Sequence, residues 1–193
     1  MTNPVNSLPF PWPLGVLLAA FAAVPIVQAV RDVRSETLLQ QAKTLQASLD
    51  LDPALKSLQD AVQINPRDAG AQLKLAQASR TLWFYRRTPA LKAQADAAFL
   101  QAQALSPTWP SPHYEHSLMY AFVEDYPRAL TILQRAIDRD PNNAAYWYQK
   151  GTYQEFSNDV KAARTSYERC LVLNDTLRDC REALSALPAG DAP

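Results

Sequence analysis

The 193-residue chain has few glycines, few cysteines and no excess of charge of either sign. Its four glycines form neither a Gly-x-Gly-x-x-Gly nor a Gly-x4-Gly-Lys-Ser/Thr phosphate loop, and they are too few for a turn-rich all-β fold. Two cysteines cannot build a four-thiolate zinc site. The 19 basic and 19 acidic residues balance, which argues against a dedicated nucleic-acid binder. What is present is 48% apolar residues in a chain rich in alanine, leucine and glutamine, which indicates a mostly helical protein with a core.

Charge is absent from the first thirty positions, and the first charged residue is Arg31. Residues 14–30 read LGVLLAAFAAVPIVQAV, an apolar run close to the roughly 20 residues that a membrane-spanning helix needs. We predict a Pro-rich uncharged tail at residues 1–13 and a single transmembrane helix at residues 14–30 that anchors the chain. Two alternatives stay open here, a signal segment cleaved near Ala29 and a soluble helix.

The flanks of this apolar run differ in charge. Arg31, Arg34 and Lys43 follow it, whereas no Lys or Arg precedes it. The positive-inside rule therefore predicts that residues 31–193 lie on the cytoplasmic side of the membrane. A periplasmic or other extracytoplasmic location is the alternative.

An internal repeat is the strongest pattern in the chain. Each copy has an alanine, a large apolar residue four positions on and a small residue three further on; a proline follows five positions later in the first three copies, and Asp175 takes its place in the fourth. The copies are Ala54-Leu58-Ala61-Pro66, Ala95-Phe99-Ala102-Pro107, Ala129-Leu133-Ala136-Pro141 and Ala163-Tyr167-Cys170-Asp175. Residues spaced by four and three share one helical face, and proline stops a helix. Each copy therefore predicts one helix that packs closely against a neighbour.

A second helix is expected before each copy, with a small residue such as Ala42, Ser117 or Gly151 that admits the facing helix. With this pattern the chain resembles the tetratricopeptide repeat family, whose unit is a 34-residue helix–turn–helix. The resemblance implies an all-α fold, a right-handed superhelix of about four repeats with a C-terminal cap helix. The repeats are expected at 35–68, 69–109 (with about seven extra residues), 110–143 and 144–177, a cap helix at 178–187 and a flexible tail at 188–193.

In this family the first helices of the repeats line a concave groove that holds a peptide. The resemblance implies a partner-binding lining of Leu73, Gln77, Arg80, Tyr114, Leu118, Phe122, Tyr148, Thr152 and Glu155. The Lys and Asn residues that clamp a peptide's terminal carboxylate in co-chaperone members are absent, and Glu115 at one such place would repel a carboxylate. An apolar or amphipathic protein segment is the expected partner. Packing within the superhelix is the alternative for each lining residue.

A second contact patch is predicted where aromatic and basic residues adjoin, at Trp83, Phe84, Tyr85, Arg86 and Arg87. Aromatic residues and arginine are enriched in interface hot spots. The alternative is that Trp83 and Phe84 cap the core of an elongated hairpin while the arginines are solvated.

Catalytic chemistry is not indicated. His113 and His116 are three residues apart on an expected helix, but they occupy places where the repeat needs packing residues, and no other histidine exists to complete a His-rich zinc site. We expect no enzyme activity, no metal, no cofactor, no small-molecule substrate and no nucleic-acid partner.

The two cysteines bear on the cellular location. Cys170 and Cys180 fall in the last repeat and the cap helix, which should pack antiparallel, so a disulfide between them is geometrically compatible. Such a bond would imply an oxidising compartment and would contradict the cytoplasmic location. Two buried free thiols are the other interpretation.

These features predict a non-catalytic, membrane-anchored protein–protein interaction module that serves as a scaffold or assembly factor for a membrane-associated complex. One alternative is an integral accessory subunit of a larger membrane protein complex. Another is a periplasmic or secreted module that is released by cleavage near Ala29.

Overall fold

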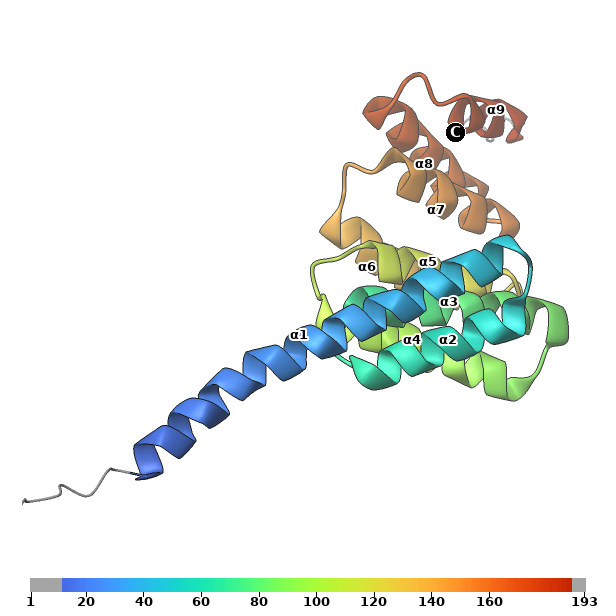
Figure 1. The fold of residues 1–193 in the computed structure, drawn as a ribbon. Coiled ribbons are helices and arrows are strands. Elements are labelled where there is room, and N and C mark those ends of the chain that lie inside the picture. Colours follow the sequence, from blue (N-terminus) through green and yellow to red (C-terminus); the bar gives the residue numbers. More distant parts are fainter. Residues whose placement is uncertain (1–11, 189–193) are drawn as a thin grey trace, which may run out of the picture.

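The computed structural model describes residues 12–188, with side chains described from residue 25 onward (Figure 1). Residues 1–11 and 189–193, which hold most of the two predicted tails, lie outside the described part. The predicted anchor at 14–30 is therefore described as backbone throughout, but as side chains only in its last six residues.

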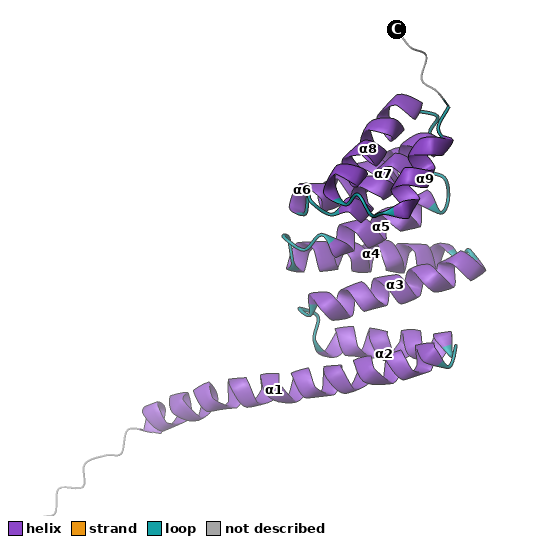
Figure 2. Ribbon diagram, turned by 90° about the horizontal axis from the view of Figure 1, so that it is seen from above, coloured by secondary structure: helices purple, strands orange, loops and turns teal. Residues whose placement is uncertain are grey.

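The described chain consists of nine helices without a strand, which confirms the all-α prediction. Consecutive helices form antiparallel pairs, and the pairs stack one on the next (Figures 1 and 2). The pairs are α1 with α2, α3 with α4, α5 with α6 and α7 with α8, and α9 packs on α8. The helices are α1 Trp12–Ala47, α2 Leu51–Ile64, α3 Ala69–Arg86, α4 Pro89–Leu105, α5 Ser111–Ala121, α6 Tyr126–Arg139, α7 Ala144–Phe156, α8 Val160–Leu173 and α9 Arg178–Ala186.

The repeated alanine, large and small residues form the core of the stack. They lie on α2, α4, α6 and α8, and none of the twelve is more than 1% exposed. A small side chain at two of the three positions lets the backbone of a neighbouring helix approach closely. A close approach is seen at Gly151 on α7, where an added Cβ would lie 2.5 Å from the ring of Tyr167 on α8.

The turn inside each pair follows one backbone design. Leu49, Arg87, Glu124 and Asn158 adopt φ values of 63°, 55°, 61° and 62° in the left-handed region. In three of the turns an aspartate follows, and its N–H donates to a carbonyl five residues earlier, as in the Schellman motif that closes a helix. The aspartate side chain then accepts a backbone N–H at the start of α6 and α8. The same residue thus ends one helix and begins the next.

The second pair is the longest of the three that follow α2. Its helices α3 and α4 have 18 and 17 residues, against 13 and 14 in α7 and α8. The extra residues are spread over both helices, so the pair stays in register. The run from Trp83 to Arg87 forms its tip.

Helix α1 has 36 residues and runs without a break from the predicted anchor into the first repeat. Ser35 Oγ donates to the carbonyl oxygen of Ala61 at 3.3 Å, and Asn65 Nδ2 donates to Asp32 Oδ1 at 3.0 Å. N-terminal to these contacts, α1 projects away from the stack (Figures 1 and 2). In the part of the chain that the structure describes, we find no helix with both the length and the apolarity to cross a membrane.

The C-terminal cap is α9, which is held on α8 by a disulfide between Cys170 and Cys180. The two Cα atoms lie 6.3 Å apart, and both side chains are fully buried. Leu184 and Leu187 pack with Tyr167 and Ala163 and shield them from solvent. The cap therefore closes the apolar end of the stack, as terminal repeats of helical arrays require.

Candidate partner-binding face

The predicted groove lining is only partly available to a partner. Tyr114, Leu118, Tyr148, Gln77 and Thr152 are half-buried, and each retains some accessible surface on α3, α5 or α7. The ring of Tyr114 lies 5.0 Å from that of Tyr146, which joins α5 to α7. Glu155 is exposed, and its Oε2 accepts a 2.7 Å hydrogen bond from the Tyr167 hydroxyl.

Two residues of the predicted lining lie elsewhere. Leu73 is 7% exposed and packs in the core of the first two repeats, so its predicted contact with a partner is wrong. Helices α2, α4 and α5 all contact α3, which leaves little of its surface free. Phe122 comes after the last turn of α5, where its ring stacks on Phe84 at 3.7 Å rather than joining the lining.

Two charged groups of this face, Arg80 and Glu115, form an ion pair. Arg80 Nη1 lies 2.8 Å from Glu115 Oε2 and donates at 2.7 Å to the Glu115 carbonyl oxygen. The two side chains are only 14% and 22% exposed, so the pair is shielded from solvent. Arg80 also lies 5.8 Å from the ring centre of Phe84 and 5.9 Å from that of Phe99. This pair connects α3 to α5 and leaves neither charge free for a ligand carboxylate.

The residues of the second predicted patch, 83–87, differ in their exposure to solvent. Trp83 is 5% exposed and belongs to the core, so its prediction as a surface contact is wrong, because α3 and α4 extend far enough to enclose it. Arg86 forms a two-pronged ion pair with Asp52 of the preceding repeat, at 2.7 and 2.6 Å. Tyr85 is 77% exposed. Arg87 lies 4.3 Å from the ring centre of Phe122.

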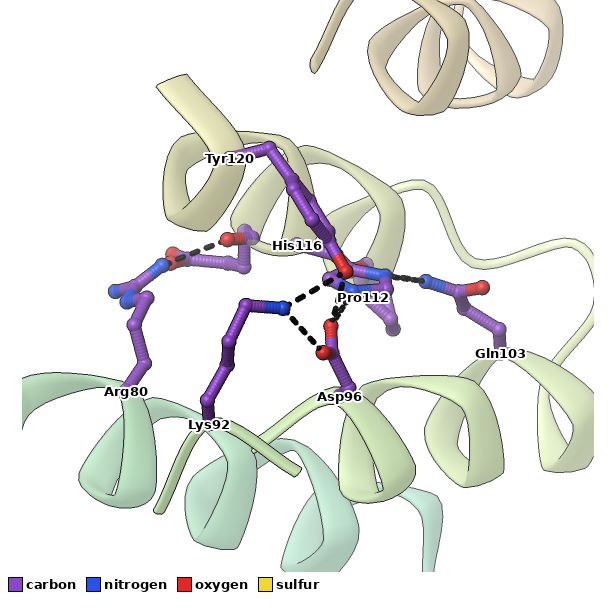
Figure 3. Close-up of polar contacts among 8 residues, drawn as sticks. Arg80, Lys92, Asp96, Gln103, Pro112, His116 and Tyr120 are labelled. Atoms are coloured by element: carbon purple, nitrogen blue, oxygen red, sulfur yellow. Dashed lines mark hydrogen bonds and ion pairs between the residues drawn. The ribbon is translucent and has the colours of Figure 1, made fainter. Parts of the chain in front are cut away.

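A polar cluster that sequence reasoning missed lies between α4 and α5 (Figure 3). Asp96 is at its centre. Its Oδ1 atom lies 2.8 Å from His116 Nε2 and accepts a hydrogen bond from the Tyr120 hydroxyl at 2.7 Å. Its Oδ2 atom accepts a hydrogen bond from Lys92 Nζ at 2.9 Å. Gln103 Nε2 lies 3.2 Å from the other ring nitrogen of His116. The only signal in the sequence is the spacing of four between Lys92 and Asp96 and between His116 and Tyr120.

Hydrogen bonding decides the charge state of this cluster. Burial by itself would raise the pKa of the Asp96 carboxyl, but the bonds from His116, Tyr120 and Lys92 outweigh it and hold that pKa well below its usual range. Burial and the bond to Asp96 raise the pKa of Tyr120. Asp96 is therefore an ionised acceptor whose partners are all donors. The cluster fastens the second repeat to the third.

His113 and His116 are 3% and 4% exposed and pack in the interior. Both ring nitrogens of His113 lack a hydrogen-bond partner. Burial, together with the charges of Arg139 and Arg135, lowers the pKa of His113 to about 4, so the ring is neutral at pH 7. Within residues 25–188 no group of three or more His, Cys, Asp or Glu side chains is placed to hold a metal ion.

Comparison with known proteins identifies the repeat. Residues 144–176 match the family described as tetratricopeptide repeat. This match covers the fourth helix pair, and solved structures of tetratricopeptide repeat proteins share the fold of the chain. No curated protein matches the sequence.

Three solved structures show this likeness. TTC0263, a tetratricopeptide repeat protein of Thermus thermophilus, is 21% identical, with 91% of this chain and 95% of that chain covered and a TM-score of 0.65. PilF of Pseudomonas aeruginosa is 19% identical over 81% of this chain and 68% of that chain, with a TM-score of 0.66. The second such domain of human RPAP3, solved with an HSP70 peptide, is 16% identical over 62% of this chain and 97% of that chain, with a TM-score of 0.51. At these identities the likeness concerns the fold. Proteins of this fold generally mediate protein–protein interactions.

Proposed function

We propose that the protein is a non-catalytic interaction module that is anchored at a membrane and holds a segment of a partner protein on the first-helix face of α5 and α7. It would serve as a scaffold or assembly factor for a membrane-associated complex. The observation that carries the proposal is the pairing of Arg80 with Glu115, which leaves neither of these two charges free for a ligand. What it leaves for a partner is the half-buried surface of Tyr114, Leu118 and Tyr148.

The chemistry of that surface favours an apolar or amphipathic segment. Two tyrosine rings and a leucine offer large contact area at low cost in side-chain entropy. A peptide with a terminal carboxylate, like the one bound to RPAP3, would find no free cation next to Glu115. Any carboxylate brought there would lose hydration without gaining an ion pair.

Attachment to a membrane rests on α1. The uncharged run of residues 14–30 continues into the first repeat within a single helix, so a membrane that held this run would also fix the orientation of the stack. The disulfide between Cys170 and Cys180 supports a location of the repeats on the oxidising, extracytoplasmic side, against the expectation from flanking charge. In sealed, right-side-out membranes, a membrane-impermeant protease should then digest residues 31–193. A protected repeat region with two alkylatable thiols would instead establish the cytoplasmic side.

Substitution on the proposed face tests partner binding. We expect Leu118→Arg to abolish recovery of the partner when the full chain is purified from membranes of its own source. The reason is that a charge would be placed in an apolar contact. Glu168→Arg on α8 is the matched control, since it adds positive charge at an exposed position away from this face.

The comparison is valid only for folded variants, so circular dichroism and thermal unfolding accompany both. The proposal predicts that Leu118→Arg unfolds near the wild-type temperature but loses the partner, and that Glu168→Arg keeps it. Equal recovery with both variants would exclude the face of α5 and α7 as the binding site.

A further inference from the structure

The projecting part of α1 carries an apolar stripe that nothing in the described chain covers. Ile26, Val30 and Val33 are 64%, 62% and 68% exposed. They line a shallow, open hollow of about 720 Å³ on the helix surface, together with Ala29, Arg34, Thr37 and Leu38. Three large aliphatic side chains in a row on a helix surface are unusual for a soluble protein unless another molecule packs there.

The stripe faces away from the stack. Two residues of α1, Ser35 and Leu39, are buried against α2. Ser35 follows Ile26 of the stripe by nine positions, and Leu39 follows Val30 by nine positions. Nine residues are two and a half helical turns, so the stripe and the contact with α2 lie on opposite sides of α1. A second helix could therefore lie along the stripe without meeting α2.

One-sided apolarity distinguishes a helix partner from lipid. Gln28 and Asp32 lie on the other side of the same segment, where Gln28 Nε2 donates to Asp32 Oδ1 at 3.0 Å. A helix surrounded by lipid is apolar all round, whereas a helix that packs on another helix is apolar along one stripe. Residues 26–34 have the second pattern, with Val27, which is 50% exposed, beside the stripe. Where the stripe overlaps the proposed anchor, at residues 26–30, the two anchors would therefore lie side by side.

The spacing of the stripe matches a two-stranded coiled coil. Ile26, Val30, Val33 and Thr37 follow one another at intervals of four, three and four, which is the a/d repeat of such a seam. In the sequence the same intervals continue backward, without a charged residue, through Val16, Ala19 and Ala23.

From this register we propose that two copies of the chain pair in parallel through the Ile26–Val33 stripe of α1. The stripe is apolar and therefore complementary to itself. In a parallel pair the flanking positions bring Ala29 opposite Arg34 and Glu36 opposite Gln41, so no like charges meet. Ser35, at the position farthest from the seam, is the residue that bonds to α2. Pairing therefore leaves the fold of each copy unchanged.

Cysteine cross-linking of the full-length chain, purified in a mild detergent, tests the pairing. Val30→Cys places a thiol in the seam, and Gln28→Cys is the matched control on the opposite side; the native cysteines are already joined within one chain. Mild oxidation should convert Val30→Cys to a covalent dimer at least about tenfold faster than Gln28→Cys, because the seam holds the two thiols at high effective concentration. Equal rates for both, or no dimer from Val30→Cys, would overturn the proposal. So would a disulfide formed in membranes only with a different protein.

Sedimentation of unmodified protein gives an independent measure. The wild-type chain should sediment as twice its mass of 21.5 kDa. Val30→Glu should raise the dimer dissociation constant by at least about tenfold, whereas Gln28→Glu should not. Val30 is exposed, so helicity by circular dichroism should be unchanged in both. A monomeric wild-type chain would refute the inference and leave the proposed partner face on α5 and α7 unaffected.

Discussion

Replacing Gly151 with alanine should destabilise the fourth repeat, although alanine is the better helix former. The new Cβ would lie 2.5, 2.6 and 3.0 Å from three ring atoms of Tyr167. That ring is 1% exposed, and its hydroxyl donates to Glu155 at 2.7 Å, so it cannot move aside without losing packing and a hydrogen bond.

The expected magnitude follows from opposing effects. Overpacking a core costs about 1–3 kcal/mol, and a strained hydrogen bond adds about 1 kcal/mol. Alanine in a helix interior recovers about 1 kcal/mol relative to glycine. We therefore expect a net loss of about 1–3 kcal/mol, which for a chain of this size lowers Tm by about 3–9 °C.

Urea and thermal unfolding followed by circular dichroism measure this loss. Gly70→Ala is the matched control, because its Cβ would meet only Asp68 Oδ1, at 3.2 Å, in the first turn of α3. The control should stay within about 1 kcal/mol of wild type. In Gly151→Ala/Tyr167→Leu the two effects should be less than additive by about 1 kcal/mol. If Gly151→Ala is as stable as Gly70→Ala, the close packing of α7 on α8 is refuted.

Three further predictions concern the interior. The pKa of His113 is lowered to about 4 in the folded chain, so only the unfolded chain takes up this proton between about pH 6.5 and pH 4. Stability should therefore fall by about 3 kcal/mol as pH falls through that window, and urea titrations of His113→Phe should show a much flatter pH dependence. Asp96→Ala should lower the free energy of unfolding by about 2–4 kcal/mol, because the donors of His116, Tyr120 and Lys92 lose their acceptor. Asp60→Ala breaks an exposed ion pair with Lys56 and should lower it by less than about 1 kcal/mol. Similar losses in the two variants would contradict the role of the cluster. Cys180→Ala should release α9 from α8, which would appear as fast amide exchange in residues 178–186 while α3–α6 stay protected. Loss of the covalent loop constraint should lower the free energy of unfolding by about 3 kcal/mol. Unchanged protection of α9 would show that apolar contacts alone hold the cap.

The repeat core could be predicted from the sequence because it depends on local spacing. Alanine, a large residue and a small residue at intervals of four and three define one helical face. All four copies are buried where that pattern places them, as at Leu58 and Tyr167. The design of the turns is local as well, since an aspartate such as Asp125 both follows a left-handed residue and caps the next helix.

The candidate site was harder to predict because it depends on contacts between repeats. Arg80 and Glu115 are 35 residues apart, and Arg86 and Asp52 are 34 apart, close to one repeat length in each case. The repeat period brings such residues near each other, but it does not tell which side chains turn toward a partner helix. For the same reason the repeat register predicts Leu73 in the groove lining, although its neighbours bury it.

Photo-cross-linking from the proposed face tests the central claim most directly. A photoreactive amino acid at Leu118 or Tyr148 should form an adduct with one defined partner protein in membranes of the native source, mapped to an apolar or amphipathic segment. The same group at Lys161, which is exposed on α8, should form none. Adducts that are equal at all three positions, or that appear only at Lys161, would contradict the assignment of α5 and α7 as the partner-binding face.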